Sequence, residues 1–345
     1  MFIMTSNITI GRYGNIKPVS VEWKCGVSSF TDTCTISLPL QRYIKSTSIT
    51  TDNIIREEAK YLDTQIKNTS GFKCLFSEGD EVDVALGYGH DKSRRFKGFV
   101  CRIDYSIPLK LHCEGYSYKL KNKIFNKSYK STTLKEILAD LVEGTGIKLS
   151  EYIPNVPFKN LSFPNYMGLK VLQWFQDKCL MSVFFDFDTI YVGHSKQGIP
   201  KGTEKLKIGW NTISCDNFQK LQDSVPTRIV LTGKNNLGEK VKVHSSFNKD
   251  TGDIKEVKIG YVLTESDLKL IADELYIYKN FNGYQGNIEC FLLPSFEKGM
   301  VANVIDDRFP ERTGYFFVEE IAGNFSSSGG RQNVTLRYYG KLRNT

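Results

Sequence analysis

Paired carboxylates are the residues of this chain whose types and spacing come closest to catalysis. Asp186 stands two residues before Asp188, and Asp306 directly precedes Asp307. One carboxyl group acting as acid beside a second acting as base or nucleophile is what glycoside hydrolysis requires. Aspartate is also common in tight turns, where its side chain binds nearby backbone amides. We interpret both pairs as turn residues and keep a glycan or cell-wall hydrolase as the alternative.

A serine and four histidines complete the candidates for catalysis. Ser195 lies in a run that resembles a nucleophile elbow, but that motif requires a glycine where Gln197 stands. The histidines are far apart in sequence and show no metal-ligand spacing: His90, His112, His194 and His244. We therefore predict no catalytic, cofactor-binding or metal-binding residue, no cofactor, and a protein that is not an enzyme.

Cysteine is frequent, but its spacing does not indicate a metal site. The 8 cysteines include no Cys-x-x-Cys pair: Cys25, Cys34, Cys74, Cys101, Cys113, Cys179, Cys215 and Cys290. Structural zinc sites normally show such closely spaced ligands. Cys101 and Cys113 alternate instead with apolar neighbours, as residues on the inner face of a strand do. We expect the thiols to be reduced core residues.

A basic stretch with interleaved aromatic residues could follow a nucleic-acid backbone. Its lysines are Lys119, Lys121, Lys123, Lys127, Lys130 and Lys135. The net charge is +8, yet 38 acidic residues are spread along the same chain. We expect a solvated strand face whose alternate residues, Leu120 and Ile124, point inward. A nucleic-acid-binding module that uses residues 119–135 is the alternative.

The elements that must position these residues indicate a mainly β protein with α+β parts. The chain has 345 residues, 40% of them hydrophobic, which is typical of a folded protein with several domains. Apolar stripes at helical spacing predict helices at 52–68 and 265–280. Thr133 and Glu136 form a capping-box pattern, which predicts a helix over 133–142. No apolar run reaches the roughly 18 residues of a membrane helix.

Two parts of the chain repeat one order of short signatures. A helix pattern is followed by a glycine that opens a strand, a Phe-Val-x-x-Ile strand and a Tyr-x-x-Lys-Leu-basic-Asn strand. The pairs are Gly79 and Gly299, Phe99–Ile103 and Phe317–Ile321, and Tyr116–Asn122 and Tyr338–Asn344. The shared order indicates a β-rich domain duplicated within one chain, with the two helices in equivalent places.

The duplication divides the chain into three predicted domains. Residues 1–118 form a first tube-like β-barrel domain that contains helix 52–68. Residues 119–205 form an inserted α+β domain with two helices and a hairpin. Residues 206–345 form a second tube-like β-barrel domain that contains helix 265–280.

This order of elements resembles the phage tail baseplate hub family, which includes the late-control-D proteins and the hub part of type VI secretion spikes. The resembling residues are Gly79–Val84, Phe96–Val100, Tyr116–Asn122 leading to the Thr133 helix, Leu293-Pro294, Gly299 and Tyr315–Ile321. Each match has low specificity by itself. The order of the domains carries most of the resemblance.

The resemblance implies a virion structural protein of a phage tail or of a tail-like contractile injection machine. In that family a homotrimer presents two barrels per subunit, so the ring adapts a sixfold tail tube to a threefold spike. The implied partners are the tail tube protein, the spike or tail-tip protein and other baseplate proteins, with no membrane and with DNA only passing through the channel. The implied location is the virion tail, assembled in the bacterial host cytoplasm. Because only Gly340–Thr345 follow Tyr339, we expect the spike and any muramidase to be separate proteins.

Overall fold

A computed structural model describes residues 3–39, 45–46, 75–221, 226–234, 239–249, 251–262, 264–281 and 283–338. The protein is mostly strand (54%) with little helix (15%), so the predicted mainly β class with α+β parts is confirmed. The predicted helix 52–68 and Cys74 lie outside the described residues. Within the described residues, no helix has the length and apolar character needed to cross a membrane.

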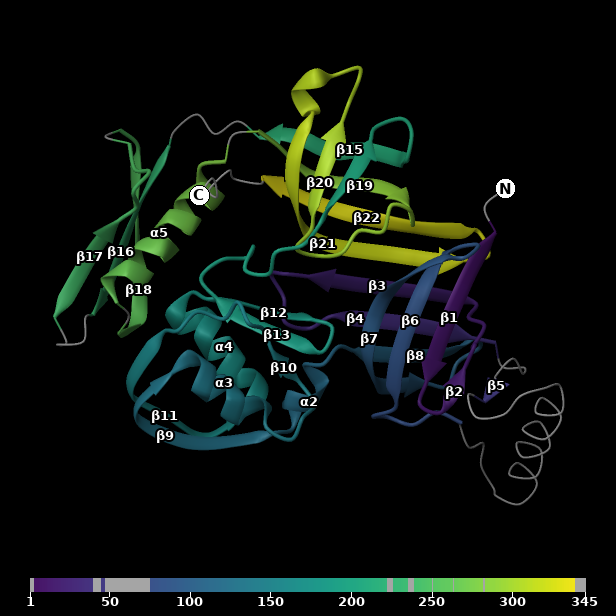
Figure 1. The fold of residues 1–345 in the computed structure, drawn as a ribbon, viewed down its shortest axis with the longest axis horizontal. Helices are drawn as coiled ribbons and strands as arrows, with labels where there is room; N and C mark the ends of the chain where they lie inside the picture. Colours follow the sequence, from purple (N-terminus) through teal and green to yellow (C-terminus); the bar gives the residue numbers. More distant parts are fainter. Residues whose placement is uncertain are drawn as a thin grey trace.

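Strands from the first third of the chain form one side of a 14-stranded sheet (Figure 1). Their order runs β3-β4-β8-β7-β6-β1, and their inner side chains, such as Ile36 and Phe96, form one core. The strands are β1 (Met4–Ile10), β2 (Tyr13–Gly14), β3 (Ser20–Gly26), β4 (Thr33–Leu38), β5 (Lys45–Ser46), β6 (Glu81–Tyr88), β7 (Asp91–Asp104) and β8 (Leu109–Glu114).

Strands from the last third continue the same sheet in the order β15-β19-β22-β21. The long strand β21 pairs with β20 up to Phe317 and then with β3 from Glu320 onward, so it joins the two parts. Phe218 and Val334 belong to a second core. The elements are β14 (Thr203–Lys207), β15 (Thr212–Leu221), β19 (Gly283–Phe291), β20 (Val301–Ile305), the 3-10 helix η1 (Pro310–Arg312), β21 (Gly314–Ser326) and β22 (Gly329–Tyr338).

The middle of the chain forms a compact α+β region. The predicted capping box is present, because Thr133 Oγ1 accepts a hydrogen bond from the Glu136 amide at 3.4 Å and the Glu136 carboxylate accepts one from the Thr133 amide at 3.0 Å. The five apolar residues of the helix that follows are buried. The elements are α2 (Tyr118–Lys121), β9 (Ile124–Thr133), α3 (Leu134–Val142), β10 (Lys148–Leu149), β11 (Pro157–Met167), α4 (Gly168–Cys179), β12 (Ser182–Asp186) and β13 (Thr189–Gly193).

Residues between β15 and β19 form a separate module of one helix on a three-stranded sheet, at the left of Figure 1. Its elements are β16 (Thr227–Lys234), β17 (Lys240–His244), β18 (Asp253–Val262) and α5 (Glu265–Lys279). Helix α5 packs across β16 and β17, and its Leu268 lies against Gly233. The helix predicted at 265–280 is therefore present, but it covers this small sheet.

The predicted duplication is visible in the strand register. We call β3, β4, β6, β7 and β8 the first strand group, and β15, β19, β20, β21 and β22 the second strand group. Phe99 on β7 stands opposite Glu81 on β6, and Phe317 on β21 stands opposite Val301 on β20. A β-bulge follows Val100 in β7, and one follows Val318 in β21. The same register with the same irregularity supports a common origin for the two groups.

The two glycines that open the repeated strands hold the same hydrogen bonds. The Gly79 amide donates to the Val100 carbonyl at 2.8 Å, and the Gly299 amide donates to the Val318 carbonyl at 2.8 Å. Both glycines have positive φ, 91° and 85°, which a residue with a Cβ rarely adopts. The sequence pairing of Gly79 with Gly299 is confirmed.

One detail of the predicted repeat is wrong. Tyr116–Asn122 is not a strand: β8 ends at Glu114, and Tyr118–Lys121 forms the short helix α2, whose buried Leu120 lies against Gly168. The partner segment lies outside the described residues from 339 onward. The predicted equivalence of the two helices stays a prediction, because 52–68 lies outside the described residues.

Candidate functional site

The candidate acidic residues form ion pairs or cap turns. Asp186 pairs with Lys201 at 2.7 Å, and Asp188 pairs with Lys148 at 3.3 Å. Burial acts to raise the pKa of Asp188, but the charges and hydrogen bond of nearby lysines outweigh it and lower the pKa. Asp306 accepts the amides of Arg308 and Phe309 at 2.9 and 3.1 Å, as a turn residue does. Both pairs therefore have local structural partners.

Ser195 and the histidines also have local structural partners. The Ser195 hydroxyl accepts the Gln197 amide at 3.1 Å, which closes a turn. His194 pairs with Asp267 at 3.1 Å and so connects the end of the α+β region to the first turn of α5. His112 pairs with Asp104 at 2.8 Å on the sheet. Among the described residues, no three metal-ligating side chains come together.

The described cysteines are free thiols, as predicted. Cys34, Cys113, Cys179 and Cys290 are buried, whereas Cys25, Cys101 and Cys215 are partly exposed. Burial raises the pKa of the Cys290 thiol to about 12. Such a thiol is a poor nucleophile at neutral pH.

The lysine stretch does not form one continuous face. Lys121 pairs with Glu114 at 3.1 Å, and Lys127 with Asp140 at 3.6 Å. Lys119 lies 4.3 Å from the ring centre of Phe99. Of the two residues expected to point inward, Leu120 is buried but Ile124 is 70% exposed. The stretch therefore runs over a short helix and a strand, with several charges already paired.

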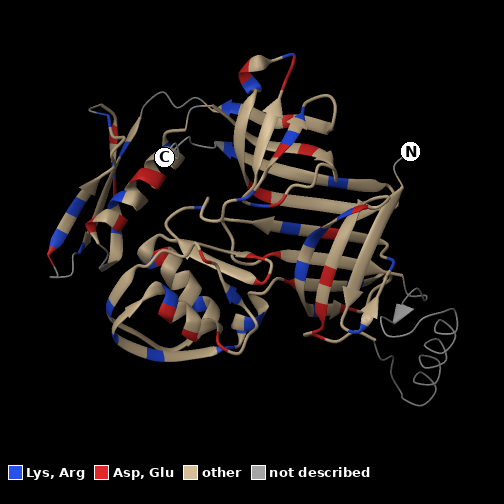
Figure 2. Cartoon of the chain, viewed as in Figure 1, with Lys and Arg blue, Asp and Glu red and all other residues tan. Residues whose placement is uncertain are grey.

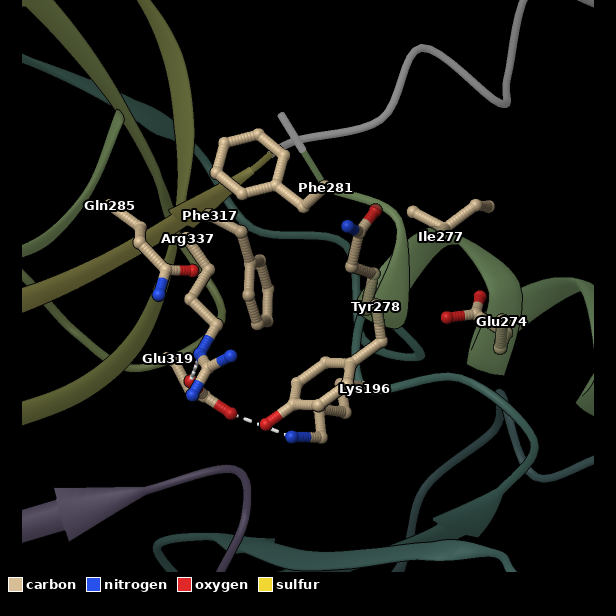
Figure 3. Close-up of a pocket in the computed structure, with 10 residues that line it drawn as sticks. Lys196, Glu274, Ile277, Tyr278, Phe281, Gln285, Phe317, Glu319 and Arg337 are labelled. Carbon is tan, nitrogen blue, oxygen red and sulfur yellow. Dashed lines mark hydrogen bonds and ion pairs between the residues drawn. The ribbon is translucent and has the colours of Figure 1, made fainter. Parts of the chain in front are cut away.

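A cluster of paired charges joins the second strand group to helix α5 of the separate module (Figure 3). Glu319 accepts hydrogen bonds from Lys196 at 2.6 Å and from Ser28 at 2.6 Å, and it also contacts Arg337. Lys196 and Arg337 each lie within 5 Å of the Tyr278 ring centre on α5. Lys196, Glu319 and Arg337 line a cavity of about 70 Å³ together with Tyr278. Because its charges are internally paired, the cluster serves as a structural clamp.

One face of the long sheet is largely polar across its central strands. Directly opposite residues share a face, and one such row crosses six strands: Arg102, His112, Thr35, Glu22, Asn324 and Arg331. A second row contains Glu114, Thr33, Lys24, Ala322, Asn333 and Glu289. We call this surface the polar face.

Basic and acidic residues both occur along the strands of the sheet (Figure 2), and some of those on the polar face form ion pairs across strands. Lys24 on β3 pairs with Glu320 on β21 at 3.0 Å, across the junction of the two strand groups. Arg331 pairs with Glu289 at 3.5 Å. A groove of about 420 Å³ runs over this junction and has Glu22, Asn324 and Arg331 among its lining residues. The face is hydrophilic but carries little net charge.

The strand path β15-β19-β22-β21-β3-β4-β8-β7 has an open edge at each end. Among the described strands, β15 pairs with β19 alone. The pairing of β7 with β6 stops at Phe99, and no described strand continues along that edge. Exposed strand edges present unpaired backbone groups that another strand can complete.

Several solved structures have a similar architecture. The chain matches a tail protein from Neisseria meningitidis MC58 with a TM-score of 0.66 and 13% identity, over 98% of each chain. It matches the 43 kDa tail protein of prophage MuSo2 from Shewanella oneidensis with a TM-score of 0.61 and 13% identity, over 98% of this chain and 97% of that one. The chain has the fold of phage tail proteins. The predicted resemblance to the tail hub family is confirmed at the level of the fold.

A third structure extends the tail-protein fold to secretion machines. The chain matches an E. coli component of the type VI secretion system, itself described as similar to T4 bacteriophage tail proteins, with a TM-score of 0.55 and 10% identity. The match covers 97% of this chain and 77% of that one. No family model and no curated protein matches the sequence.

Sequence reasoning missed the polar face and the two open edges. The polar face is split between alternate residues of β3, β21 and β22, so no single motif shows it. The alternation in Val21-Glu22-Trp23-Lys24 was a usable signal, because it places Glu22 and Lys24 on one side of a strand. The edges depend on which strands pair, and local sequence does not specify that.

Proposed function

We propose that this chain is a structural hub protein of a phage tail or tail-like injection machine, and that three copies form a ring. Residues 1–118 and 206–345 each supply one barrel-like unit, so three chains place six similar units around one axis. The fold shared with tail proteins supports the tail role. The matching register of the two strand groups is the observation that carries the proposal.

A duplicated unit solves a symmetry mismatch. A ring of three chains with six similar units can meet a sixfold tube on one side and a threefold spike or tip on the other. Rings form when each copy contacts the next through unlike surfaces and the rotation closes. The partners that we propose are a tail tube protein, a spike or tip protein and other baseplate proteins, and the location is the virion tail.

The polar face then lines the central channel. Its paired charges, such as Lys24 with Glu320, leave few free cations to hold the phosphates of passing DNA. The catalytic and nucleic-acid-binding alternatives have no comparable support, because Asp186, Asp188 and the 119–135 lysines are engaged in local ion pairs or lie apart.

Light scattering coupled to size exclusion tests the ring. We expect the mass of the purified chain at high micromolar concentration to be three times 39.3 kDa. A monomer at that concentration, with no three-chain ring in assembled tails, would contradict the proposal. Unchanged mass after a rise in salt is also expected, because strand pairing and apolar contacts depend little on ionic strength.

A further inference from the structure

At the junction between the two strand groups, a strand of one group pairs with a strand of the other group within one chain. Strand β21 pairs antiparallel with β3 from Glu320 opposite Gly26 to Ser326 opposite Ser20. Phe325, near the end of β21, is only 7% exposed and packs in the core of the first strand group. The contact therefore combines a backbone ladder with one inserted apolar side chain.

The first strand group has the counterpart of this inserting strand, but nothing in the described chain receives it. Ile103 on β7 matches Ile321 on β21, since each follows its bulge in the same register. Ile107 stands four residues after Ile103, as Phe325 stands four residues after Ile321. Ile107 is 86% exposed, and Tyr105 is 67% exposed.

The second strand group has the counterpart of the receiving strand. Trp23 on β3 stands opposite Cys34, and Phe218 on β15 stands opposite Gly286, the matching residue of β19. The last residues of β15, Gln219–Leu221, are exposed, and Leu221 is 42% exposed. The outer edge of β15 is therefore the matched equivalent of the β3 edge that β21 occupies.

We propose that β7 of one copy pairs with β15 of the next copy in the way that β21 pairs with β3 within one chain. Transferring the register places Arg102 opposite the next copy's Leu221 and Asp104 opposite its Gln219. Ile107 then packs on the second strand group of that copy. The inference rests on the proposed ring and names the surfaces that close it.

This contact accounts for two features that a lone chain leaves exposed. An unpaired strand edge beside exposed apolar side chains promotes pairing with another chain. Both edges in this protein are adjacent to such side chains: Tyr105 and Ile107 by β7, and Leu221 on β15. Because the two edges differ, the contact is heterologous, and three copies can close it into a ring in which both of these edges are paired.

Cysteine cross-linking tests the register. In a chain carrying Arg102→Cys and Leu221→Cys, directly opposite residues have Cα atoms about 4.5–5.5 Å apart, within reach of a disulfide. We expect mild oxidation to give covalent dimers and trimers. The control chain carries Arg102→Cys and Asn217→Cys, whose sites in the proposed register lie about 13 Å apart along the strand. It should stay monomeric on a denaturing gel, although its native cysteines are the same.

A second pair of variants tests the inserted side chain. Ile107→Asp should weaken assembly at least about tenfold, since a buried isoleucine would become a buried charge. Its matched control is Ile124→Asp, which changes another exposed isoleucine away from both edges and should leave assembly unchanged.

The outcomes separate this contact from the ring itself. A trimer that fails to cross-link at 102 and 221 and tolerates Ile107→Asp overturns this contact and leaves the ring proposal standing. A chain that stays monomeric and yields no cross-link overturns both. Cross-linking of the out-of-register control as strongly as the matched pair also overturns the register.

Discussion

The two strand groups use matching positions for opposite purposes. Phe325 lies one residue before the end of the paired part of β21 and is 7% exposed, whereas Ile107, at the matching place after β7, is 86% exposed. The backbone determinants that the groups share, a positive-φ glycine and a bulge after valine, are kept in both. The two groups thus share the geometry of their sheets but differ at their edges, of which one makes a contact within the chain and one faces outward.

Charges differ between the groups in the same way. The bulge residue is Cys101 in β7 but Glu319 in β21, where it binds Lys196 and Arg337. The residue before the conserved glycine is the exposed Glu78 in the first group but the buried Lys298 in the second, paired with Asp32 at 2.6 Å. The second group thus holds the ion pairs that attach it to the rest of the chain.

The inserted apolar residue gives the largest expected contrast. Phe325→Ala should lower the free energy of unfolding by about 3–5 kcal/mol, because it empties part of a packed core. Ile107→Ala should change it by less than about 0.5 kcal/mol in the isolated chain, because the side chain is exposed. Urea unfolding at low protein concentration measures both. Equal losses would show that the two positions are not opposite in burial.

The buried ion pair gives a second large contrast. Lys298→Ala leaves Asp32 buried without its cation, which should cost about 3–5 kcal/mol. Glu78→Ala, at the matching position of the first group, should cost under about 0.5 kcal/mol. Thermal and urea unfolding of the two variants make the comparison, and a near-neutral Lys298→Ala would count against a role for this pair in joining the groups.

The charged clamp should show its effect in the pH dependence of stability. Burial acts to raise the pKa of Glu319, but Lys196, Ser28 and Arg337 outweigh it and hold the pKa below its ordinary value of about 4.5. The folded state therefore binds the proton at a lower pH than the unfolded state does. The stabilisation is present above about pH 4.5 and is lost as the pH falls through the lower pKa of the folded state.

Glu319→Gln removes this stabilisation and serves as the test. It should cost about 1.5–3 kcal/mol at pH 7, the usual contribution of hydrogen bonds to a charged group. Its difference from the native chain should shrink at acid pH. Cys101→Ala at the matching bulge should show no such pH dependence. A difference for Glu319→Gln that is constant from pH 3 to 7 would rule out the ionised carboxylate as the cause.

The matching glycines give the smallest effect and the closest comparison. Gly79→Ala and Gly299→Ala each place a Cβ at positive φ, which should cost about 1–2 kcal/mol. Neither site is crowded, since the nearest atoms to the added Cβ lie 3.9 and 3.7 Å away. The two losses should therefore agree within about 0.5 kcal/mol. Clearly unequal losses in the free energy of unfolding would contradict the equivalence of the two strand groups.

The parts of the fold that local chemistry determines could be predicted from sequence. Thr133 with Glu136 caps α3 as expected, and Gly79 and Gly299 mark equivalent strands. Both features depend on a few neighbouring residues. The prediction failed at Tyr116–Asn122, where alternating residues suggested a strand, because tertiary packing of Leu120 selects a helix there.

The candidate contact surface could not be predicted in the same way. The strand that pairs with the outer edge of β3 or of β15 is selected by long-range contacts, which no local pattern encodes. The sequence predicts α5 from its ordinary amphipathic stripe and assigns it to the second barrel domain. Its partner sheet, β16 to β18, becomes clear only when the strands are paired in space.

An electron cryomicroscopy map of the assembled oligomer is the most direct test of the ring. We expect three chains that place six similar units around one axis. In the map, β7 of each chain should lie beside β15 of the next chain and continue its sheet. A map in which the two strand groups of one chain do not occupy equivalent places around the axis would contradict the account.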